Sequence, residues 1–281
     1  ANLEVHIGDV SSSSVLSQDL MDRLALMLDT TPPAAASTRI ALSGTSLAIT
    51  VSLTESVASS TDLANSSLSL TTGGIARTAS FSAIESDLAN GKLVYLYNLT
   101  DFSQSVQIGQ IDLNGAVIRD AAGNALVPVG LNPLLSQIDV ADGQSLSFSG
   151  GYTGSGDFIK TGNGELILTG NSTHTGNTVV RGGTLTITSD LQLGPDVATP
   201  TAGRLVIEDG ATLKINATMT LDAERGIRIQ GQGAIEVASG VTATYNGTIC
   251  VDAATGVTYG SSTPTRSPGL VKRAVSRPSA N

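Results

Sequence analysis

The chain has 281 residues, and its 15 Lys and Arg against 24 Asp and Glu give a formal net charge of −9 and a pI near 4.6. Such an acidic surface repels phosphate backbones and anionic lipid headgroups, so no nucleic-acid partner is expected and a membrane-surface role is disfavoured. With 31 Gly, no Trp and 3% aromatic residues a large aromatic core is excluded, but 40% hydrophobic residues still suffice for a core built from thin strands.

Residues 1–28 are open to two interpretations. Leu3, Val5 and Ile7 alternate as in a strand. Leucines then recur every four residues, as in an amphipathic helix, at Leu16, Leu20, Leu24 and Leu28. We predict a connector or the end of a preceding module here. The sequence has no initiator Met and no leader at its start, which predicts a mature or excised segment.

Residues 29–132 have the pattern of an antiparallel β-sandwich. Pro32 and Pro33 cannot donate ladder hydrogen bonds and stiffen the chain, which suits a module boundary. Strand-like runs then follow at spacings of roughly 10 to 15 residues, with polar turns between most of them. The predicted strands are Arg39–Ser43, Ser46–Thr54, Ser66–Thr71, Lys92–Leu99, Ser105–Asp112 and Ala116–Arg119.

Three motifs in this region carry a resemblance to a known family. They are Asp29-Thr-Thr-Pro-Pro33, Leu53-Thr-Glu-Ser-Val57 and Ile118-Arg-Asp-Ala-Ala-Gly-Asn124. The region resembles the bacterial immunoglobulin-like (Ig-like) repeats of large adhesins, which begin with D-x-T-P-P, carry F-S-E-x-V in an early strand and close near D-x-x-G-N. Leu-Thr replaces the usual Phe-Ser here. The resemblance implies an Ig-like sandwich.

The closing turn of this region combines a glycine with oxygen-bearing side chains. Gly123 suits a position that needs φ > 0, and Asp120 and Asn124 can close the turn through their side chains. Together with Asp112, these two residues could hold a Ca²⁺ between modules through oxygen ligands. No other cofactor or metal is predicted, because no H-E-x-x-H or C-x-x-C spacing occurs.

Residues 133–258 carry short alternating strands separated by glycine-rich turns, which predicts a parallel β-solenoid. Aliphatic pairs recur at steps of roughly 20 to 22 residues, as expected when a coil returns to the same side after one rung. The first series is Leu185/Ile187, Leu205/Ile207 and Ile227/Ile229, and the second is Leu213/Ile215 and Ile235/Val237. We therefore predict that Leu185, Leu205 and Ile227 lie directly over one another in one wall, about 4.8 Å apart from rung to rung.

The run from Lys160 to Ile187 reads KTGNGELILTGNSTHTGNTVVRGGTLTI. It resembles the autotransporter passenger-associated repeat, K-x-G-x-G-x-L-x-L-x-G-x-N-T-Y-T-G-x-T-x-V-x-x-G-T-L-x-V, with His174 at the position of the usual Tyr. The resemblance extends over about 145–250. It implies a right-handed parallel β-helix in a passenger domain that is exported to a Gram-negative cell surface.

The C-terminal residues 259–281 depart from this pattern. Pro268-Gly-Leu-Val-Lys272 is similar to the start of another rung, but a basic, strand-poor sequence follows it. We predict a disordered tail there. No series of amphipathic strands ending in an aromatic residue follows, so the outer-membrane β-barrel translocator of such passengers is predicted to be absent from this chain.

Few residues of this sequence are of the kinds and spacings that catalysis requires. The two histidines, His6 and His174, are far apart, and no G-x-S-x-G elbow occurs, so no catalytic or cofactor-binding residue is predicted. We expect His174 to be a solvated turn residue and Cys250 to be a small buried hydrophobic residue. Gly151–Gly156 and Gly231–Gly233 are predicted to be solenoid turns. Three carboxylate pairs could nevertheless act in a hydrolase, namely Asp222/Glu224, Glu208/Asp209 and Asp139/Asp142.

Two functions follow as expectations. The first is a structural and adhesive passenger segment at the bacterial cell surface, which contacts host-cell, matrix or neighbouring-cell ligands through its long faces. The alternative is a β-helical polysaccharide lyase or hydrolase, which the scarcity of aromatic sugar platforms disfavours. We also predict that rungs template one another during export. Deleting the rung Thr184–Gly203 should then reduce surface display.

Overall fold

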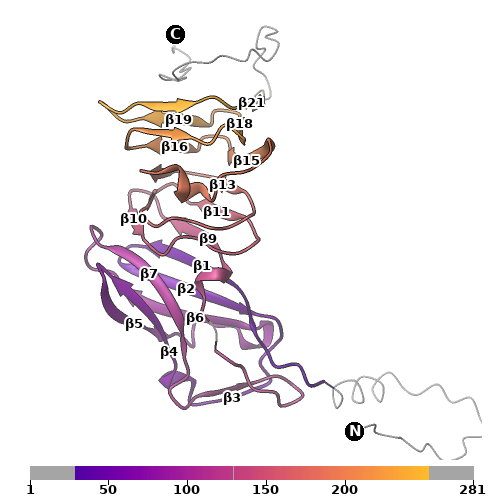
Figure 1. Cartoon of the computed structure of the whole chain (residues 1–281). Coiled ribbons are helices and arrows are strands. Elements are labelled where there is room, and N and C mark those ends of the chain that lie inside the picture. The colour runs from indigo at the N-terminus through magenta and orange to yellow at the C-terminus, as the bar shows by residue number, and fades with distance from the viewer. Residues whose placement is uncertain (1–28, 129, 253–281) are drawn as a thin grey trace, which may run out of the picture.

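The computed structural model describes residues 29–128 and 130–252, in which every regular element is a strand or a short 3₁₀ turn (Figure 1). The predicted connector at 1–28 and the predicted tail at 259–281 lie outside the described residues. An antiparallel part comes first along the chain, and a stack of thin rungs follows it (Figure 1). The all-β prediction is therefore confirmed, and so is the change from antiparallel to parallel strands.

The antiparallel part is one continuous, bent sheet. Its six strands pair in the order β1 (Ala35–Ser43), β2 (Ser46–Leu53), β6 (Lys92–Asn98), β5 (Ile75–Phe81), β4 (Ser67–Thr72) and β7 (Ser105–Asp112). The sheet bends between β5 and β6, which pair only at Ser80–Leu96 and Phe81–Tyr95. A separate pair, β3 (Ser59–Thr61) and β8 (Val117–Arg119), lies beside it.

Alternation of apolar residues places the core of this part between the two halves of the bent sheet. Leu47, Ile49 and Val51 are fully buried on one half, while Leu68 and Val106 are fully buried on the other. Because successive residues of a strand face opposite sides, each of these sets lies on one face. All six predicted strands occur with small shifts at their ends; β3 and β5 were not predicted. The Ig-like topology stays a prediction.

Both outer strands of the bent sheet continue into the coil by parallel pairing. β1 pairs with β9 (Leu135–Val140), with Ile40 opposite Ile138, and β7 pairs with β10 (Ser145–Phe148), with Val106 opposite Phe148. The apolar cores of the two parts are one cluster. The antiparallel part therefore forms the floor of the coil, whereas the sequence suggested two modules in series.

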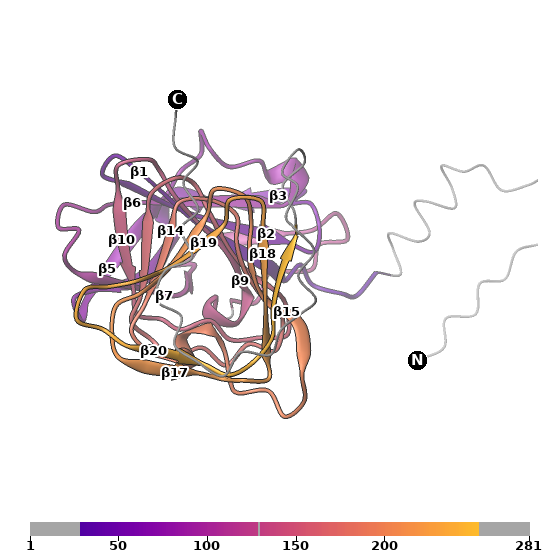
Figure 2. The same ribbon diagram turned by 90° about the horizontal axis from the view of Figure 1, so that it is seen from above.

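Two stacks of parallel strands form two sides of the coil. The first is β9, β11 (Phe158–Thr161), β13 (Thr178–Val180), β15 (Thr201–Ile207), β18 (Arg225–Gln230) and β21 (Ile249–Asp252). The second is β10, β12 (Glu165–Leu168), β14 (Thr184–Ile187), β16 (Thr212–Ile215) and β19 (Ala234–Val237). A third side contains β17 (Met219–Leu221) and β20 (Ala243–Tyr245), and the outline from above is roughly triangular (Figure 2). The solenoid prediction is confirmed up to Asp252, its residues 253–258 lie outside the described residues, and the handedness of the coil stays a prediction.

One part of the predicted register is wrong. Leu205 does lie below Ile227, but Leu185 belongs to the other stack, where it lies between Leu166 and Leu213. The residue that Leu205 covers is Thr178. The reason is that one rung is longer than the rung before it. The step from Leu185 to Leu213 is 28 positions, whereas the step from Leu166 to Leu185 is 19. The extra length includes the 3₁₀ turn η4 (Asp190–Leu193) and the following loop.

Candidate functional site

Several polar side chains of the run from Lys160 to Ile187 are buried in the coil. Lys160 on β11 is fully buried, and its Nζ donates hydrogen bonds to the backbone carbonyls of Thr161 (2.8 Å), Gly162 (2.7 Å) and Gly182 (3.0 Å). The last of these belongs to the next rung. Burial lowers the pKa of this ammonium group to about 8, and the charge of Asp139 opposes that shift. Lys160 therefore joins the turns of two successive rungs.

His174 is fully buried, so the prediction of a solvated turn residue is wrong. Its ring packs against Tyr152, with 4.8 Å between ring centroids, and its Nε2 lies 3.1 Å from Thr178 Oγ1. Burial, and after it the charges of Arg204 and Arg225, lower the pKa of His174 to about 4. The imidazole is therefore neutral at pH 7. The ring therefore lies inside the coil, where it contacts both Tyr152 and Phe158.

Two buried arginines hold the long rung against its neighbours. Arg204 donates to the backbone carbonyls of His174 (3.0 Å), Thr175 and Gly176. Arg225 is completely buried, forms an ion pair with Asp190 at 2.9 Å, and donates to the carbonyls of Leu193 and Gly194. Burial raises the pKa of Asp190, and the neighbouring guanidinium opposes the rise. Buried charges need partners of this kind, so these groups serve packing.

Glycines allow successive turns to approach closely. A Cβ at Gly151, where φ is +58°, would lie 2.0 Å from the carbonyl oxygen of Asn171 in the next rung. A Cβ at Gly176 would lie 2.1 Å from the carbonyl oxygen of Gly156. The two glycine motifs at Gly151–Gly156 and Gly231–Gly233 lie in turns of the coil, as predicted.

A cluster of three carboxylates lies in the antiparallel part. One oxygen each of Asp29, Glu55 and Asp120 lies within 4.8 Å of the others. Partial desolvation, followed by the charges of Asp29 and Asp120, raises the pKa of Glu55. Desolvation opposes ionisation of Asp120 too, but hydrogen bonds from Asn124 and the backbone outweigh it and lower the pKa of Asp120.

The predicted Ca²⁺ set is only partly brought together. Asn124 donates to Asp120 through its backbone (2.8 Å) and its side chain (2.9 Å), and Gly123 has φ of +92°, both as predicted. Asp112 is not a member of the carboxylate cluster and accepts a hydrogen bond from Gln110. Asp29 and Glu55 were not predicted to lie near Asp120, although they belong to the Asp29–Pro33 and Leu53–Val57 motifs. Oxygen ligands of this kind suit Ca²⁺.

Four of the six carboxylates in the three predicted pairs accept hydrogen bonds in turns or between rungs. Asp222 accepts hydrogen bonds from the amides of Val197 and Glu224, and Asp209 accepts one from Gln232. Other hydrogen bonds join Glu208 to Arg181 and Asp139 to Thr161.

Cys250 is exposed, contrary to the prediction that it is buried. It lies between Ile249 and Val251 on β21 and pairs with the exposed Arg228 below it. Strand alternation therefore turns its side chain outward, which outweighs the usual preference of cysteine for the interior.

Two surface hollows of the antiparallel part differ in the polarity of their linings. One is lined by Thr45, Ser46, Thr78, Ser80, Leu96, Tyr97 and Asn98. The other is lined by Leu63, Ala64, Phe81, Ala83, Ser86 and Leu88. Neither lining contains a carboxylate or a histidine.

Comparison with known families gives one match. Residues 158–187, from β11 to β14, match the family model described as Passenger-associated-transport-repeat. Neither curated proteins nor solved structures gave a match. Within 29–128 and 130–252, no helix is long and apolar enough to cross a membrane. The chain thus carries an autotransporter passenger repeat at residues 158–187, folded as two successive rungs of its coil.

Proposed function

We propose that this chain is a structural and adhesive segment of an exported passenger, displayed on the outer surface of a Gram-negative bacterium. The observation that carries the proposal is the repeat at 158–187, whose four strands β11 to β14 stack in register on one another and on the rungs below and above. A passenger repeat implies export, and a coil built of such rungs extends away from its anchor.

Adhesion would come from the flat sides of the coil. One column on the outer face of the second stack runs through Ser147, Ile167, Thr186, Lys214 and Glu236. Glu236 is exposed, Ser147, Ile167 and Lys214 are half-buried, and Thr186 is covered. Parallel pairing repeats such a column at the spacing of the strands, so a partner could contact several rungs at once. We propose host-cell, matrix or neighbouring-cell surface molecules as the partners.

Binding of the purified chain to cells and to matrix proteins tests the adhesive role. We expect saturable binding that decreases when Lys214 and Glu236 are both replaced by Ala, since both point away from the core. Replacing the exposed Ile84 of the antiparallel part by Ala is the matched control and should leave binding unchanged. Absence of saturable binding would remove adhesion from the proposal. Release of reducing sugar from polysaccharides would replace it by the polysaccharide-cleaving alternative.

Surface display tests the export role. Since Thr184 lies under Thr212, a deletion that removes one whole rung spans residues 184–211, and not the predicted 184–203. The shorter deletion ends within β15 and shifts the register. If rungs template one another, loss of residues 184–211 should reduce displayed protein at constant transcript level. Deleting the exposed loop residues 198–200 is the control and should preserve display. Normal display without the rung would contradict templating.

A further inference from the structure

The bent sheet has a hollow where β5 and β6 separate. The two strands pair at only two positions, and the pair nearest the gap is Ser80–Leu96. Continuing this register would place Thr78 opposite Asn98, but these two residues are not paired. A hollow of about 460 Å³ lies at this point, lined by residues of β5, of β6, and of β2 with the turn before it. Its volume is within the range of about 300–1,000 Å³ that is usual for small-molecule sites.

The side chains that line this hollow carry many hydrogen-bonding groups. Thr78 and Ser80 alternate with the buried Ala79, so both hydroxyls lie on the outer face of β5. Five exposed polar residues and one half-buried tyrosine line the hollow, namely Thr45, Ser46, Thr78, Ser80, Asn98 and Tyr97. None of these six side chains is hydrogen-bonded to another residue in the part of the chain that the structure describes. Their hydroxyl and amide groups are therefore free to bind a ligand.

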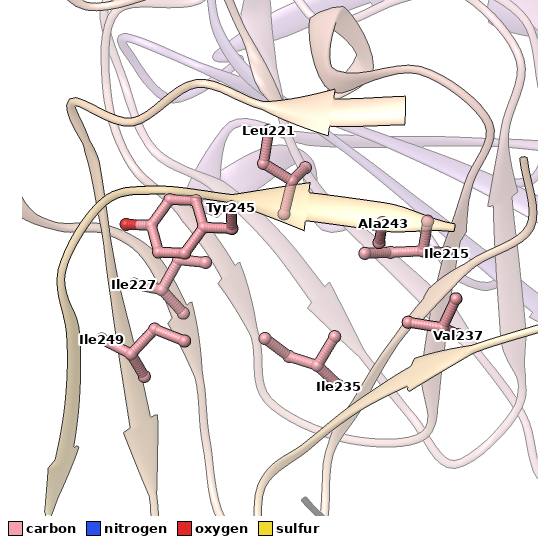
Figure 3. A pocket seen from close by; sticks show the side chains of 8 residues that line it. All are labelled: Ile215, Leu221, Ile227, Ile235, Val237, Ala243, Tyr245 and Ile249. Carbon is pink, nitrogen blue, oxygen red and sulfur yellow. The ribbon is translucent and has the colours of Figure 1, made fainter. Parts of the chain in front are cut away.

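The hollow between the three sides of the coil has the opposite character. Figure 3 shows its eight lining side chains, of which all but Tyr245 are aliphatic. The Tyr245 hydroxyl is already satisfied, because it donates to the backbone carbonyl of Arg225 at 2.7 Å. Among these eight residues no polar side chain is left for a ligand. The hollow between β5 and β6 is therefore the better site for a polar molecule.

The lining of the hollow between β5 and β6 selects a neutral ligand that carries both donors and acceptors. Among the described residues, no Asp, Glu, Lys, Arg or His lines it, so a charged ligand would lose water without gaining a counter-charge. An apolar ligand would remove water from the hydroxyls and return no hydrogen bonds. Hydroxyl and amide groups both donate and accept, which matches the hydroxyl groups of a sugar. The half-buried Leu96 and Tyr97 add apolar surface for the C–H face of a sugar ring.

The backbone of β6 adds a donor and an acceptor at the same place. The amide of Ser82 donates to the carbonyl of Val94 (2.8 Å), and the amide of Leu99 donates to the carbonyl of Thr45 (2.7 Å). Because alternate residues of a strand direct their backbone groups to opposite neighbours, even-numbered residues of β6 face β5. The N–H and C=O of Asn98 therefore face the hollow. An extended peptide could use them too, but this free edge of β6 is a single residue, which is too short for strand pairing.

We propose that the hollow between β5 and β6 binds a neutral glycan, which is held by the hydroxyls of Thr78 and Ser80 and by Asn98. This assignment rests on the proposed adhesive function, because it names the class of surface molecule that the antiparallel part contacts. It adds a second contact to the one proposed for the flat side of the coil. A peptide strand is the competing occupant.

Titration with neutral tetrasaccharides, followed by methyl NMR of the whole chain, tests the site. The probes are lacto-N-tetraose, cellotetraose and chitotetraose. At least one of them should shift the methyl signals of Leu96 and Thr78 in a saturable manner, because both residues line the hollow. The methyl signals of Ile84, which is exposed elsewhere on the antiparallel part, are the control and should stay unchanged. Absence of a saturable shift with all three probes at millimolar concentration would overturn the proposal.

A double variant removes two of the proposed hydrogen bonds. Thr78→Ala together with Asn98→Ala should weaken binding of the tetrasaccharide by at least about fivefold, since each lost hydrogen bond costs a factor of roughly two or more. Ser59→Ala together with Thr61→Ala is the matched control, because both positions are exposed on β3 outside this lining, and should leave the affinity unchanged. All four positions are exposed, so both variants should melt at the temperature of the unmodified protein. Equal losses of affinity in the two variants would contradict the site.

Binding to cells separates failure of this site from failure of adhesion. Mild periodate oxidation destroys cell-surface sugars and should reduce saturable binding, and the Thr78/Asn98 double variant should bind untreated cells less well. Binding that resists periodate and is equal in both proteins would overturn the glycan site and leave adhesion intact. Binding that resists periodate, is lost after protease treatment of the cells and is weakened in the double variant would assign the hollow to a peptide. Absence of saturable binding to cells, matrix proteins and tetrasaccharides would remove both proposals.

Discussion

Arg225 and Asp190 form an ion pair inside the coil across 35 positions of sequence, with 2.9 Å between Nη2 and Oδ2. Asp190 belongs to η4 of the long rung, and Arg225 opens β18 in the rung above. The pair therefore fixes the irregular rung to a regular one. Removing one partner of a buried pair leaves the other charge without compensation.

Replacing Arg225 by Met should lower the free energy of unfolding by about 3–5 kcal/mol, because Asp190 and the carbonyls of the long rung lose their donor. Urea unfolding monitored by circular dichroism measures the change. Arg228→Met is the matched control, since Arg228 forms an exposed ion pair with Asp252 at 2.7 Å. Exposed pairs contribute about 1 kcal/mol or less. Equal losses in the two variants would contradict this assignment.

The buried His174 should make the protein less stable in weak acid. Its pKa in the folded protein is about 4, below the ordinary value of 6.5, so between these values the unfolded chain binds the proton more strongly. Stability should therefore be complete above pH 6.5 and decrease as the pH falls toward 4. Desolvation and two neighbouring arginines are the causes.

His174→Phe keeps a ring between Tyr152 and Phe158 but removes the titration. The melting temperature of the unmodified protein should decrease between pH 7.5 and pH 4.5, by an amount equivalent to roughly 1–3 kcal/mol. The variant should lose a smaller part of its stability over the same interval. An identical pH profile for both proteins would show that His174 does not titrate as inferred.

Lys160→Met should cost about 1–3 kcal/mol, because three backbone carbonyls lose a charged donor inside the coil. The methionine fills similar space, which separates the loss of hydrogen bonds from the loss of packing. Lys214→Met, at a half-buried outward position on β16, should change stability by less than about 0.5 kcal/mol. Thermal unfolding of both variants checks the difference, and a neutral Lys160→Met would show that the carbonyls find other partners.

Two glycines of the matched repeat should respond differently to alanine. At Gly176 the new Cβ would lie 2.1 Å from the carbonyl oxygen of Gly156, whereas at Gly182 its nearest neighbour is an oxygen at 3.3 Å. Gly176→Ala should therefore destabilise the protein by about 1–3 kcal/mol and Gly182→Ala by less. Denaturant midpoints measure the order, and the reverse order would contradict the close approach of these turns.

Strand positions and facing were largely predictable because both are local. Alternation in Thr184–Ile187 places Leu185 and Ile187 inward, and both are fully buried. Which residue lies above Leu185 was not predictable, because it depends on the length of the loop after η4. A loop has no periodicity that reveals how many residues it adds. The prediction of which residues lie over one another was therefore wrong at the long rung. It was correct where successive rungs have the usual length of about 22 residues, as from Leu205 to Ile227 and from Leu213 to Ile235.

Predictions from residue type failed where strand geometry decided the outcome. Cys250 faces solvent because its neighbours Ile249 and Val251 take the inward positions. His174 lies inside the coil, where its ring packs against Tyr152. β5 was missed because only Ala79 of its seven residues is buried, so it carries no alternating apolar pattern. The convergence of Asp29 and Glu55 on Asp120 joins distant segments and has no local signal.

The pairing of β1 with both β2 and β9, and of β7 with both β4 and β10, gives the molecule a polarity. Each of these strands has neighbours along both edges, so the floor offers neither strand to an incoming chain. At the opposite end, β19 and β21 each have one edge without a neighbour among residues 29–128 and 130–252. The two parallel stacks can therefore be extended by strand pairing at the end of β19 and β21, but not at the floor.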